Sequence, residues 1–350
     1  MKKALLLTAG VILYSCGGGG GGGVSSNSGS SSYKLAKLDE PEIAENTSTT
    51  SVRTVQSLTG VSEKAATSKS LSSSKSSKGW LITLLQKSVG QKEITQATRG
   101  NTFTIPCLNS GGYLNANIYY DLKDGVSQPQ SCSDFRSIRI HVTNTSSEKD
   151  CVLGDYVIYK GAPFSMLITG SELKDPDCFP SKAEILVDDG VVVHLQNGTP
   201  DEAYDYNSLK IAYSNIVWNG DEIASVKYSV TGGANYLPGQ FPDTNGRIDY
   251  YFNITGTGTE TSDTFSGYIK LGCLDGWLKV DTLEPIKYSA DGELQQGKIK
   301  VSAADGNFVI AYSDSGIDIT ETIGDKTETY HYNSFDEIKD SLQGVTCTYR

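Results

Sequence analysis

Apolar and polar side chains alternate with a period of two over much of the chain after Thr102. Such alternation places every second residue on the same side of an extended backbone, which is the pattern of a β-strand with one buried face. The alternation is clearest in residues 114–120, 209–218, 248–254, 265–271 and 308–312. A chain with this pattern can bury its apolar residues only by pairing its strands into a sheet.

Tight-turn dipeptides separate these strand-like segments. Asn-Gly and Asp-Gly pairs tolerate the positive φ angles of two-residue hairpin turns, and sequential hairpins build an antiparallel sheet. The clearest hairpins are expected around Asp189-Gly190 and Asn219-Gly220. The pairs begin at Asp124, Asp189, Asn197, Asn219, Asn245, Asp275, Asp291 and Asp305. The sequence therefore predicts a mainly β fold, a large antiparallel sheet built of hairpins, and does not decide between an open, a sandwich and a barrel-like arrangement.

Two short helices are expected at the margins of the sheet. Over about residues 80–90, apolar side chains such as Trp80 and Leu84 fall within one arc at about 100° per residue. Ser334-Phe335-Asp336-Glu337 has the form of a capping box, which predicts a second helix over about residues 335–342.

The first residues have the order of a secretory signal. Two lysines precede an apolar run over residues 4–13, which is shorter than the ~20 residues that a membrane-spanning helix needs. The motif Leu13-Tyr14-Ser15-Cys16 then resembles the lipobox of bacterial envelope lipoproteins. This resemblance implies that residues 1–15 are a signal peptide removed by cleavage. It also implies that Cys16 becomes an N-terminal residue carrying diacylglyceryl and palmitate-type N-acyl chains.

Gly17, rather than Asp, follows Cys16. By the same resemblance this implies sorting to the outer membrane of a two-membrane bacterium, on a face that the sequence does not specify. The expected partner is therefore the membrane itself, reached through the acyl chains on Cys16.

Composition divides the mature chain into two parts. Residues 16–79 are rich in Gly and Ser and poor in large apolar groups, so they cannot offset the ~1 to 2 kcal/mol per residue that ordering a backbone costs. We expect a lipidated, disordered tether over residues 16–79 and a β-rich, disulfide-bonded domain over residues 80–350. The domain carries 21 basic and 36 acidic groups, a formal net charge of −15, which opposes binding to nucleic acid.

Six cysteines remain once Cys16 is acylated, and an even number in an exported chain predicts a disulfide framework. They are Cys107, Cys132, Cys151, Cys178, Cys273 and Cys347. Because the first four fall close together, two bridges are expected among them, and the favoured pairs are Cys107 with Cys151 and Cys132 with Cys178. Cys273 and Cys347 are then left for each other. No pair has the C-x-x-C spacing of a zinc site, so no metal is expected.

The domain also carries short motifs that point to a family. Cys107-Leu-Asn-Ser-Gly-Gly112 opens a strand pattern, and Cys151 follows the next long one. Gly267-Tyr268-Ile269 is followed by Gly297-Lys298-Ile299-Lys300-Val301. On these residues the chain from about Cys107 onward resembles an uncharacterised family of β-rich bacterial envelope lipoproteins, over half of the domain. The resemblance implies a fold class and a location, and it implies no activity.

Residues that could carry catalysis are few and scattered. His141 and His194 fall inside strand patterns, and His331 stands between two tyrosines. The sequence has no G-x-S-x-G, H-E-x-x-H or Cys/His cluster that would place a histidine beside a nucleophile or a zinc ion. Structural roles are therefore expected for all three histidines, and no catalytic residue is predicted.

Two acidic runs hold oxygen ligands of the kind that calcium prefers. Residues 243–249 surround a glycine turn, but the last position of that loop is Ile254 rather than the bidentate Glu of an EF-hand. The second run consists of Asp314, Asp318, Glu321 and Asp325. Turns and solvated strand faces account for both runs. No cofactor is expected, with calcium as the less favoured alternative.

Aromatic residues form a third group of candidates. Twenty tyrosines and three tryptophans could furnish a stacking platform for sugars or peptides. Tyrosine also suits half-buried strand positions, because its ring packs while its hydroxyl stays in water. Packing in the sheet is the favoured interpretation for these rings, among them Trp80, Trp218 and Trp277.

Together these features predict a non-enzymatic, lipid-anchored protein of the bacterial cell envelope that acts as a binding, assembly or surface module. Its ligand, an envelope protein or a glycan, is not specified by the sequence. One alternative is an envelope-polysaccharide hydrolase with two facing carboxylates about 5 to 10 Å apart. Another is a purely structural surface coat protein.

Overall fold

The computed structural model describes residues 33–38, most of residues 101–333, and Glu337. Within the long range it leaves out residues 108–111, 128, 145–149, 154–155, 160, 175–177, 197–198, 220–221, 238–247, 260–261, 273 and 289–293. The strands are β1 (Asn101–Pro106), β2 (Tyr113–Leu122), β3 (Phe135–Thr143), β4 (Cys151–Leu153), β5 (Tyr156–Ile158), β6 (Phe164–Lys174), β7 (Phe179–Gln196), β8 (Thr199–Asn219), β9 (Glu222–Leu237), β10 (Ile248–Gly258), β11 (Ser262–Leu271), β12 (Leu278–Tyr288), β13 (Leu294–Ser302), β14 (Gly306–Ser313), β15 (Gly316–Ile323) and β16 (Lys326–Tyr332). A short 3₁₀ helix, η2 (Cys132–Asp134), precedes β3.

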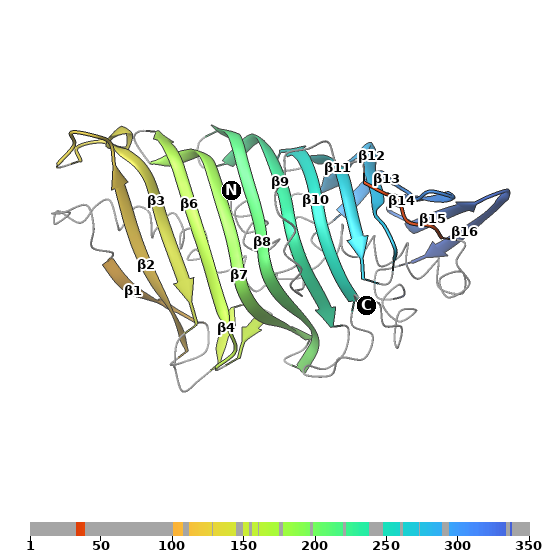
Figure 1. The fold of residues 1–350 in the computed structure, drawn as a ribbon, viewed down its shortest axis with the longest axis horizontal. Coiled ribbons are helices and arrows are strands. Elements are labelled where there is room, and N and C mark those ends of the chain that lie inside the picture. The colour runs from red at the N-terminus through yellow and green to blue at the C-terminus, as the bar shows by residue number, and fades with distance from the viewer. Residues whose placement is uncertain are drawn as a thin grey trace.

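Fourteen of these strands form one continuous antiparallel path, from β1 at one end to β16 at the other (Figure 1). Their order follows the chain, except that β4 and β5 pair with each other beside the path and β6 lies next to β3. In Figure 1 strands β2 to β10 are seen face on and the last strands nearly edge on, as expected when strand twist accumulates along a sheet. The prediction of a mainly β, antiparallel fold is confirmed. Among the described residues the sheet is open, because β1 and β16 do not pair.

One row of residues shows how the sheet builds its core. From β2 to β14, each residue of the row lies directly opposite the next, and nearly all of them are buried and apolar. The row consists of Ile118, Ile140, Ile168, Ile185, Ile211, Val230, Ile254, Gly267, Val280, Val301 and Phe308. Because side chains alternate along a strand, in-register pairing puts all of them on one face. This face is the hydrophobic core of the protein.

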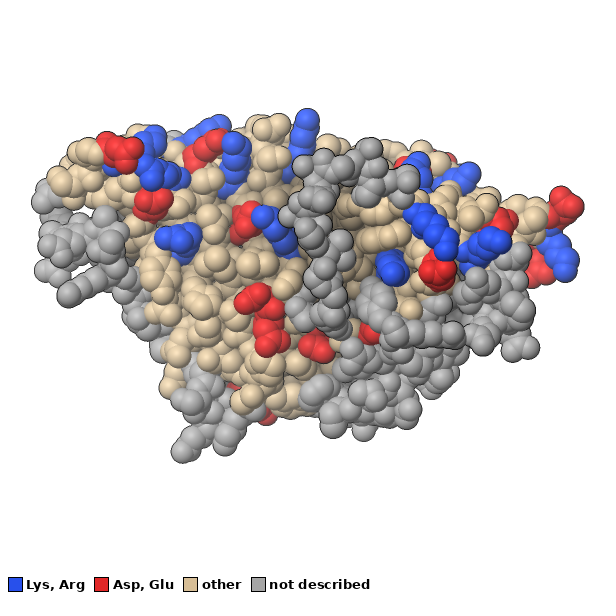
Figure 2. Space-filling view, in the orientation of Figure 1, with Lys and Arg blue, Asp and Glu red and all other residues tan. Residues whose placement is uncertain are grey.

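The opposite face of the sheet is polar. Arg139 on β3 lies opposite Tyr119 on β2 and holds its guanidinium 5.9 Å from the centre of that ring. Lys210 on β8 pairs with Glu184 on β7 at 2.6 Å. Figure 2 shows Lys and Arg interspersed with Asp and Glu on the side of the molecule in view. The two faces therefore differ as the period-two pattern predicts.

The core row ends on carboxylates at the last two strands. Glu321 on β15 lies between Phe308 on β14 and Glu328 on the edge strand β16, and only 7 % of Glu321 is exposed. Burial, followed by the charge of Glu328, raises the pKa of Glu321 to about 7. An inward-pointing charge near a sheet edge disfavours the addition of another strand. This pair therefore protects the edge at β16 from pairing with a second chain.

The two predicted hairpins have different outcomes. The chain reverses between Asn219 at the end of β8 and Glu222 at the start of β9, as predicted. The hairpin predicted at Asp189-Gly190 is wrong, because β7 runs through both residues without a break. Gly190 instead lies opposite Phe164 on β6, where an added Cβ would be 3.0 Å from the aromatic ring. This glycine leaves room for a ring rather than forming a turn.

The helices predicted over residues 80–90 and 335–342 lie outside the described residues, apart from Glu337. Within the described ranges, no helix has the length and apolar character needed to cross a membrane.

Six residues of the predicted tether are packed against the sheet. Residues 33–38, called the docked segment below, contact Trp277, directly before β12, and the turn between β13 and β14, and appear in Figure 1 as the short red trace beside the last strands. Ala36 and Leu38 are fully buried in the main core. The expectation of a disordered tether therefore does not hold for these six residues, because a short extended peptide can combine backbone hydrogen bonds with two buried side chains. The rest of residues 16–79 lies outside the described residues.

Replacing Val301 with Ala is expected to lower the free energy of unfolding by about 2 to 3 kcal/mol, because Val301 is fully buried and its loss leaves a cavity in the core row. The matched control is Val217→Ala, which removes the same atoms from a side chain that is 51 % exposed. That change should cost only a few tenths of a kcal/mol. Urea unfolding of the two variants measures both values, and equal losses would contradict the assignment of the core face.

Candidate functional site

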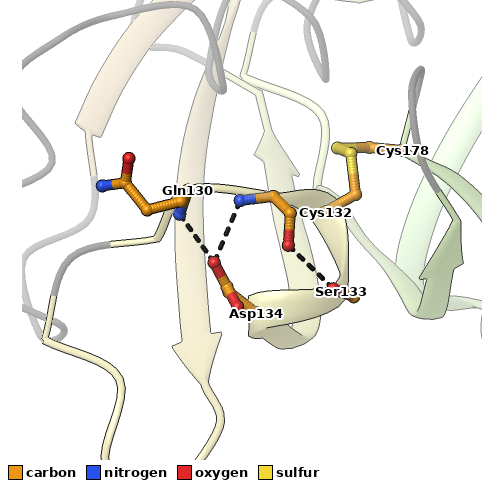
Figure 3. The surroundings of a disulfide bond; sticks show 6 residues. Gln130, Cys132, Ser133, Asp134 and Cys178 are labelled. Carbon is orange, nitrogen blue, oxygen red and sulfur yellow. Dashed lines mark hydrogen bonds between the residues drawn. A yellow bond between two sulfur atoms is a disulfide. The ribbon is translucent and has the colours of Figure 1, made fainter.

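The first four cysteines form two disulfides. Cys107, directly after β1, is joined to Cys151 in β4, with their Cα atoms 5.3 Å apart. Cys132 in η2 is joined to Cys178 directly before β7, with their Cα atoms 5.0 Å apart (Figure 3). These are the two pairs that the sequence analysis favoured.

Both bridges have the setting of structural cross-links. Cys132, Cys151 and Cys178 are buried, which removes their sulfur atoms from external thiols. The bridges span 44 and 46 residues of sequence, and the two spans overlap. They therefore tie together the loops around β1, β4, η2 and the start of β7. Cys16, Cys273 and Cys347 lie outside the described residues.

A carboxylate holds the loop that presents Cys132. Asp134 accepts hydrogen bonds from the backbone N–H groups of Gln130 at 2.6 Å and Ser131 at 2.9 Å (Figure 3). These bonds lower the pKa of Asp134, and the bond from Gln130 has the larger effect. The Asp134 side chain thus bonds to the backbone of its own loop, which fixes the position of Cys132 for the disulfide with Cys178.

The described histidines make contacts between neighbouring strands. His141 Nε2 on β3 lies 3.0 Å from the Oγ atom of Ser165 on β6. His331 Nδ1 lies 2.8 Å from Oδ1 of Asp318, its register partner on β15. A catalytic triad also needs a carboxylate that orients the histidine from the side away from the nucleophile, and the described contacts of His141 include none. The side chain of His194 lies outside the described residues.

The second acidic run does not converge on one point. Asp314 and Asp325 stand in the turns at opposite ends of β15, while Asp318 and Glu321 lie on opposite faces of that strand. Residues 243–247 of the first run lie outside the described residues. In the part of the chain that the structure describes, no group of three or more His, Cys, Asp or Glu side chains is placed to hold a metal ion.

Trp218 packs within the sheet. Its ring stacks on Phe179 with centroids 4.7 Å apart, and its Nε1–H donates a hydrogen bond of 2.8 Å to the backbone oxygen of Pro180. This ring has both an apolar partner and a satisfied polar atom, as expected for a structural tryptophan. Trp80 lies outside the described residues.

Trp277 belongs to an aromatic cluster on the polar side of the sheet. Tyr33 of the docked segment packs edge-on against Trp277 at 4.8 Å and stacks on Tyr268 at 4.1 Å between ring centroids. Tyr251 meets Trp277 edge-on at 5.8 Å. The rings most suited to a stacking platform thus have a partner already, and this partner comes from the chain's own N-terminal part.

A buried carboxyl on β11 was missed by the sequence analysis. Asp263 Oδ2 accepts a hydrogen bond of 2.7 Å from the Tyr228 hydroxyl on β9. Asp263 Oδ1 is sealed from solvent. Burial raises the pKa of Asp263 to about 6, although the bond from Tyr228 lowers it. Burial and then the Asp263 charge raise the pKa values of Tyr228 and Tyr288 well above their usual range.

A glycine makes the contact between Tyr228 and Asp263 possible. Gly256 lies on β10, between the two strands that carry the tyrosine and the acid, and a Cβ added there would be 2.3 Å from Cζ of Tyr228. The ring therefore crosses β10 over a position without a side chain. Gly256 inside a strand pattern was the available sequence signal, but the ring and the acid that use the space depend on the register of three strands.

No family model matches the chain, and no curated protein matches it.

Replacing both Cys132 and Cys178 with Ala is expected to lower the free energy of unfolding by about 4 kcal/mol, because the bridge closes a long loop and so restricts the unfolded chain. Urea unfolding under non-reducing conditions measures this loss. The control is Ser133→Ala, at the exposed neighbour of Cys132, which should change stability far less. An unchanged urea midpoint in the double variant would show that the bridge does not stabilise the fold.

Replacing Asp263 with Asn is expected to change how stability depends on pH. Because the folded pKa is raised, the carboxyl stabilises the fold fully below its ordinary pKa of 3.8, and this contribution is lost as the pH rises through about 6. The loss amounts to about 3 kcal/mol. The uncharged Asn avoids this loss and still offers an oxygen to Tyr228.

Urea unfolding of both proteins at about pH 4 and about pH 7.5 measures the effect. The stability of Asp263→Asn relative to the wild type should rise between the two values by about 2.5 kcal/mol, because a small part of the loss has already occurred at pH 4. Asp314→Asn, in the exposed turn before β15, controls for the loss of one negative charge. A difference for Asp263→Asn that is the same at both pH values would contradict the buried-carboxyl assignment.

Proposed function

We propose that this chain is a lipid-anchored protein of the bacterial cell envelope, and that its open sheet is a non-enzymatic binding or assembly module. The observation that carries the proposal is the N-terminal order of lysines, short apolar run and Leu13-Tyr14-Ser15-Cys16. In bacterial lipoproteins, which this order resembles, acyl chains on the cysteine hold the protein on the membrane. Gly17 after the cysteine favours the outer membrane.

The disulfides support export from the cytoplasm. Disulfides persist in oxidising compartments such as the periplasm and the cell surface, and are rare where glutathione and thioredoxin keep thiols reduced. The bridges from Cys107 to Cys151 and from Cys132 to Cys178 fit the first setting.

The polar face of the sheet supports a binding role. It presents half-exposed rings, with Tyr113 and Tyr119 each 38 % exposed, beside mixed charges. Such rings offer a rigid contact area and a hydroxyl that can hydrogen-bond, which suits contacts with proteins and glycans. An envelope protein or a glycan is therefore the proposed ligand class.

The described acids give less support to a polysaccharide hydrolase. Asp263 and Glu321 have the raised pKa values expected of a general acid, but β11 and β15 have three strands between them. That is about 19 Å of sheet, whereas glycosidase carboxyls lie about 5 to 10 Å apart. Glu328 lies directly opposite Glu321, and we assign this pair of carboxylates to the protection of the β16 edge rather than to catalysis. A structural coat protein would use the same anchor and sheet without a ligand.

The anchor is tested by expressing the full chain in a two-membrane bacterium. Mass spectrometry of the N-terminal peptide is expected to show acylated Cys16, and the protein should be in the outer-membrane fraction. Cys16→Ser should release it to the soluble envelope fraction, because the acyl chains are its attachment. The control is Ser15→Ala, which keeps a small residue before the cysteine and should be processed normally. An intact Met1 or an unmodified Cys16 would contradict the proposed lipid anchor.

A further inference from the structure

The docked segment is held along one edge by the backbone of Trp277. Lys34 O accepts a hydrogen bond of 2.9 Å from the Trp277 N–H, and the Ala36 N–H donates one of 2.9 Å to Trp277 O. The two bonds make a parallel β-bridge between Leu35 and Trp277. Main-chain bonding of this kind is how an extended peptide is recognised when it adds to a sheet.

Further along the segment, its backbone also bonds to the turn between β13 and β14. Ala36 O accepts a hydrogen bond of 2.7 Å from the Ala304 N–H, in the turn between β13 and β14. The Leu38 N–H points at the carboxylate of Asp305, 2.8 Å from Oδ1 and 3.0 Å from Oδ2. The contacts of the segment with Trp277, directly before β12, and with Ala304 and Asp305 in the β13–β14 turn define its binding site, called the slot below.

Side chains give the slot its selectivity. Ala36 and Leu38 enter the main core and are fully buried. At the other end Tyr33 stacks on Tyr268, and its hydroxyl accepts a hydrogen bond from the side-chain amide of Asn253. A ligand of this slot needs an aromatic residue at its first position and apolar residues at its fourth and sixth.

Gly276 is the feature that identifies the slot as built for a peptide backbone. Its φ of +152° is a conformation that residues with a Cβ rarely adopt, and a Cβ there would lie 2.6 Å from the backbone nitrogen of Ala36. A glycine at such a point allows another backbone to approach closely. The three atoms nearest to that Cβ position belong to the backbone of Leu35 and Ala36 in the docked segment.

The segment and its slot are far apart in the chain. The slot lies on β12 to β14, whereas the next described residue after the segment is Asn101, at the start of β1 and at the other end of the sheet (Figure 1). The pairing of β1 through β16 does not include the segment. It can therefore leave the slot without breaking any strand pair of the sheet.

We propose that this slot is a binding site for an extended peptide of the type Tyr-Lys-Leu-Ala-Lys-Leu, filled in cis by residues 33–38, and that its occupancy sets the reach of the membrane anchor. The second part rests on the proposed lipidation of Cys16. With the slot filled, 16 residues separate Cys16 from the docked segment, and they extend at most ~58 Å. With the slot empty, the connection from Cys16 to β1 has 84 residues, with a limit of ~300 Å.

The binding site is tested on a soluble Cys16→Ser chain with a specific protease site inserted within residues 70–78. After cleavage of the folded protein, the N-terminal fragment is expected to co-elute with the sheet in size-exclusion chromatography. Excess synthetic peptide of residues 33–38 should displace it. Leu38→Asp, which puts a charge into the core position, should release the fragment, whereas Lys37→Asp, at the exposed neighbour, should retain it.

Gly276→Ala tests the slot itself, with Gly170→Ala as the control, because a Cβ at Gly170 meets its nearest neighbour at an ordinary 3.4 Å. Loss of the fragment from a Gly276→Ala protein that keeps its circular dichroism supports the proposal. If that variant does not fold, Leu38→Asp decides, because it alters only the segment. Release of the fragment from the unsubstituted protein, or its retention by Leu38→Asp, overturns the binding site.

The reach is tested with the acylated protein on vesicles that contain an acceptor-labelled lipid, with a donor dye attached at residue 313 in the exposed end of β14. Energy transfer should fall in Leu38→Asp and stay unchanged in Lys37→Asp. Equal transfer in both variants overturns the role in anchor reach. Absence of acylation, seen by mass spectrometry, is a failure of the proposed function and leaves the result on the soluble protein standing.

Discussion

The antiparallel register from β2 to β14 keeps one row of apolar side chains in phase across the sheet, and the rest of the structure depends on it. A slip of one residue between any two strands would turn every later apolar side chain to the polar face. Each strand therefore stabilises the register of the next, and Val301 near the end of the row is as deeply buried as Ile140 near its start. The core belongs to the set of strand pairs rather than to any one segment.

An open sheet has two ends, and the two are handled differently. Near β1, the disulfides from Cys107 to Cys151 and from Cys132 to Cys178 join segments that strand pairing does not link directly. At β16 the core row ends on Glu321 and Glu328, so that the last strand offers charge rather than apolar surface. The docked segment closes the core at a third place, between β12 and the β13–β14 turn, with Leu38 as its buried side chain.

The contact between Asp263 and Tyr228 depends on the register of the strands and cannot be read from the amino-acid composition. Asp263 meets Tyr228 only because Gly256, on the strand between them, leaves room for the ring. The carboxyl is sealed from solvent at Oδ1, and its burial raises its pKa to about 6, which makes the stability of the fold depend on pH at this residue.

The sequence by itself determined the period-two strands and the antiparallel sheet, because these follow from local alternation and tight turns. It favoured the two disulfide pairs among the first four cysteines, and the structure decided them. It also contains the N-terminal order of lysines, apolar run and Cys16 that resembles a lipoprotein signal. It misjudged Asp189-Gly190, whose turn-forming chemistry is overridden by the pairing of β7 with β6 and β8. The open form of the sheet, the Asp263 contact and the docking of residues 33–38 were decided only by the tertiary structure. The physical reason is that each depends on which distant strands are neighbours, and a residue's own sequence surroundings carry no record of that.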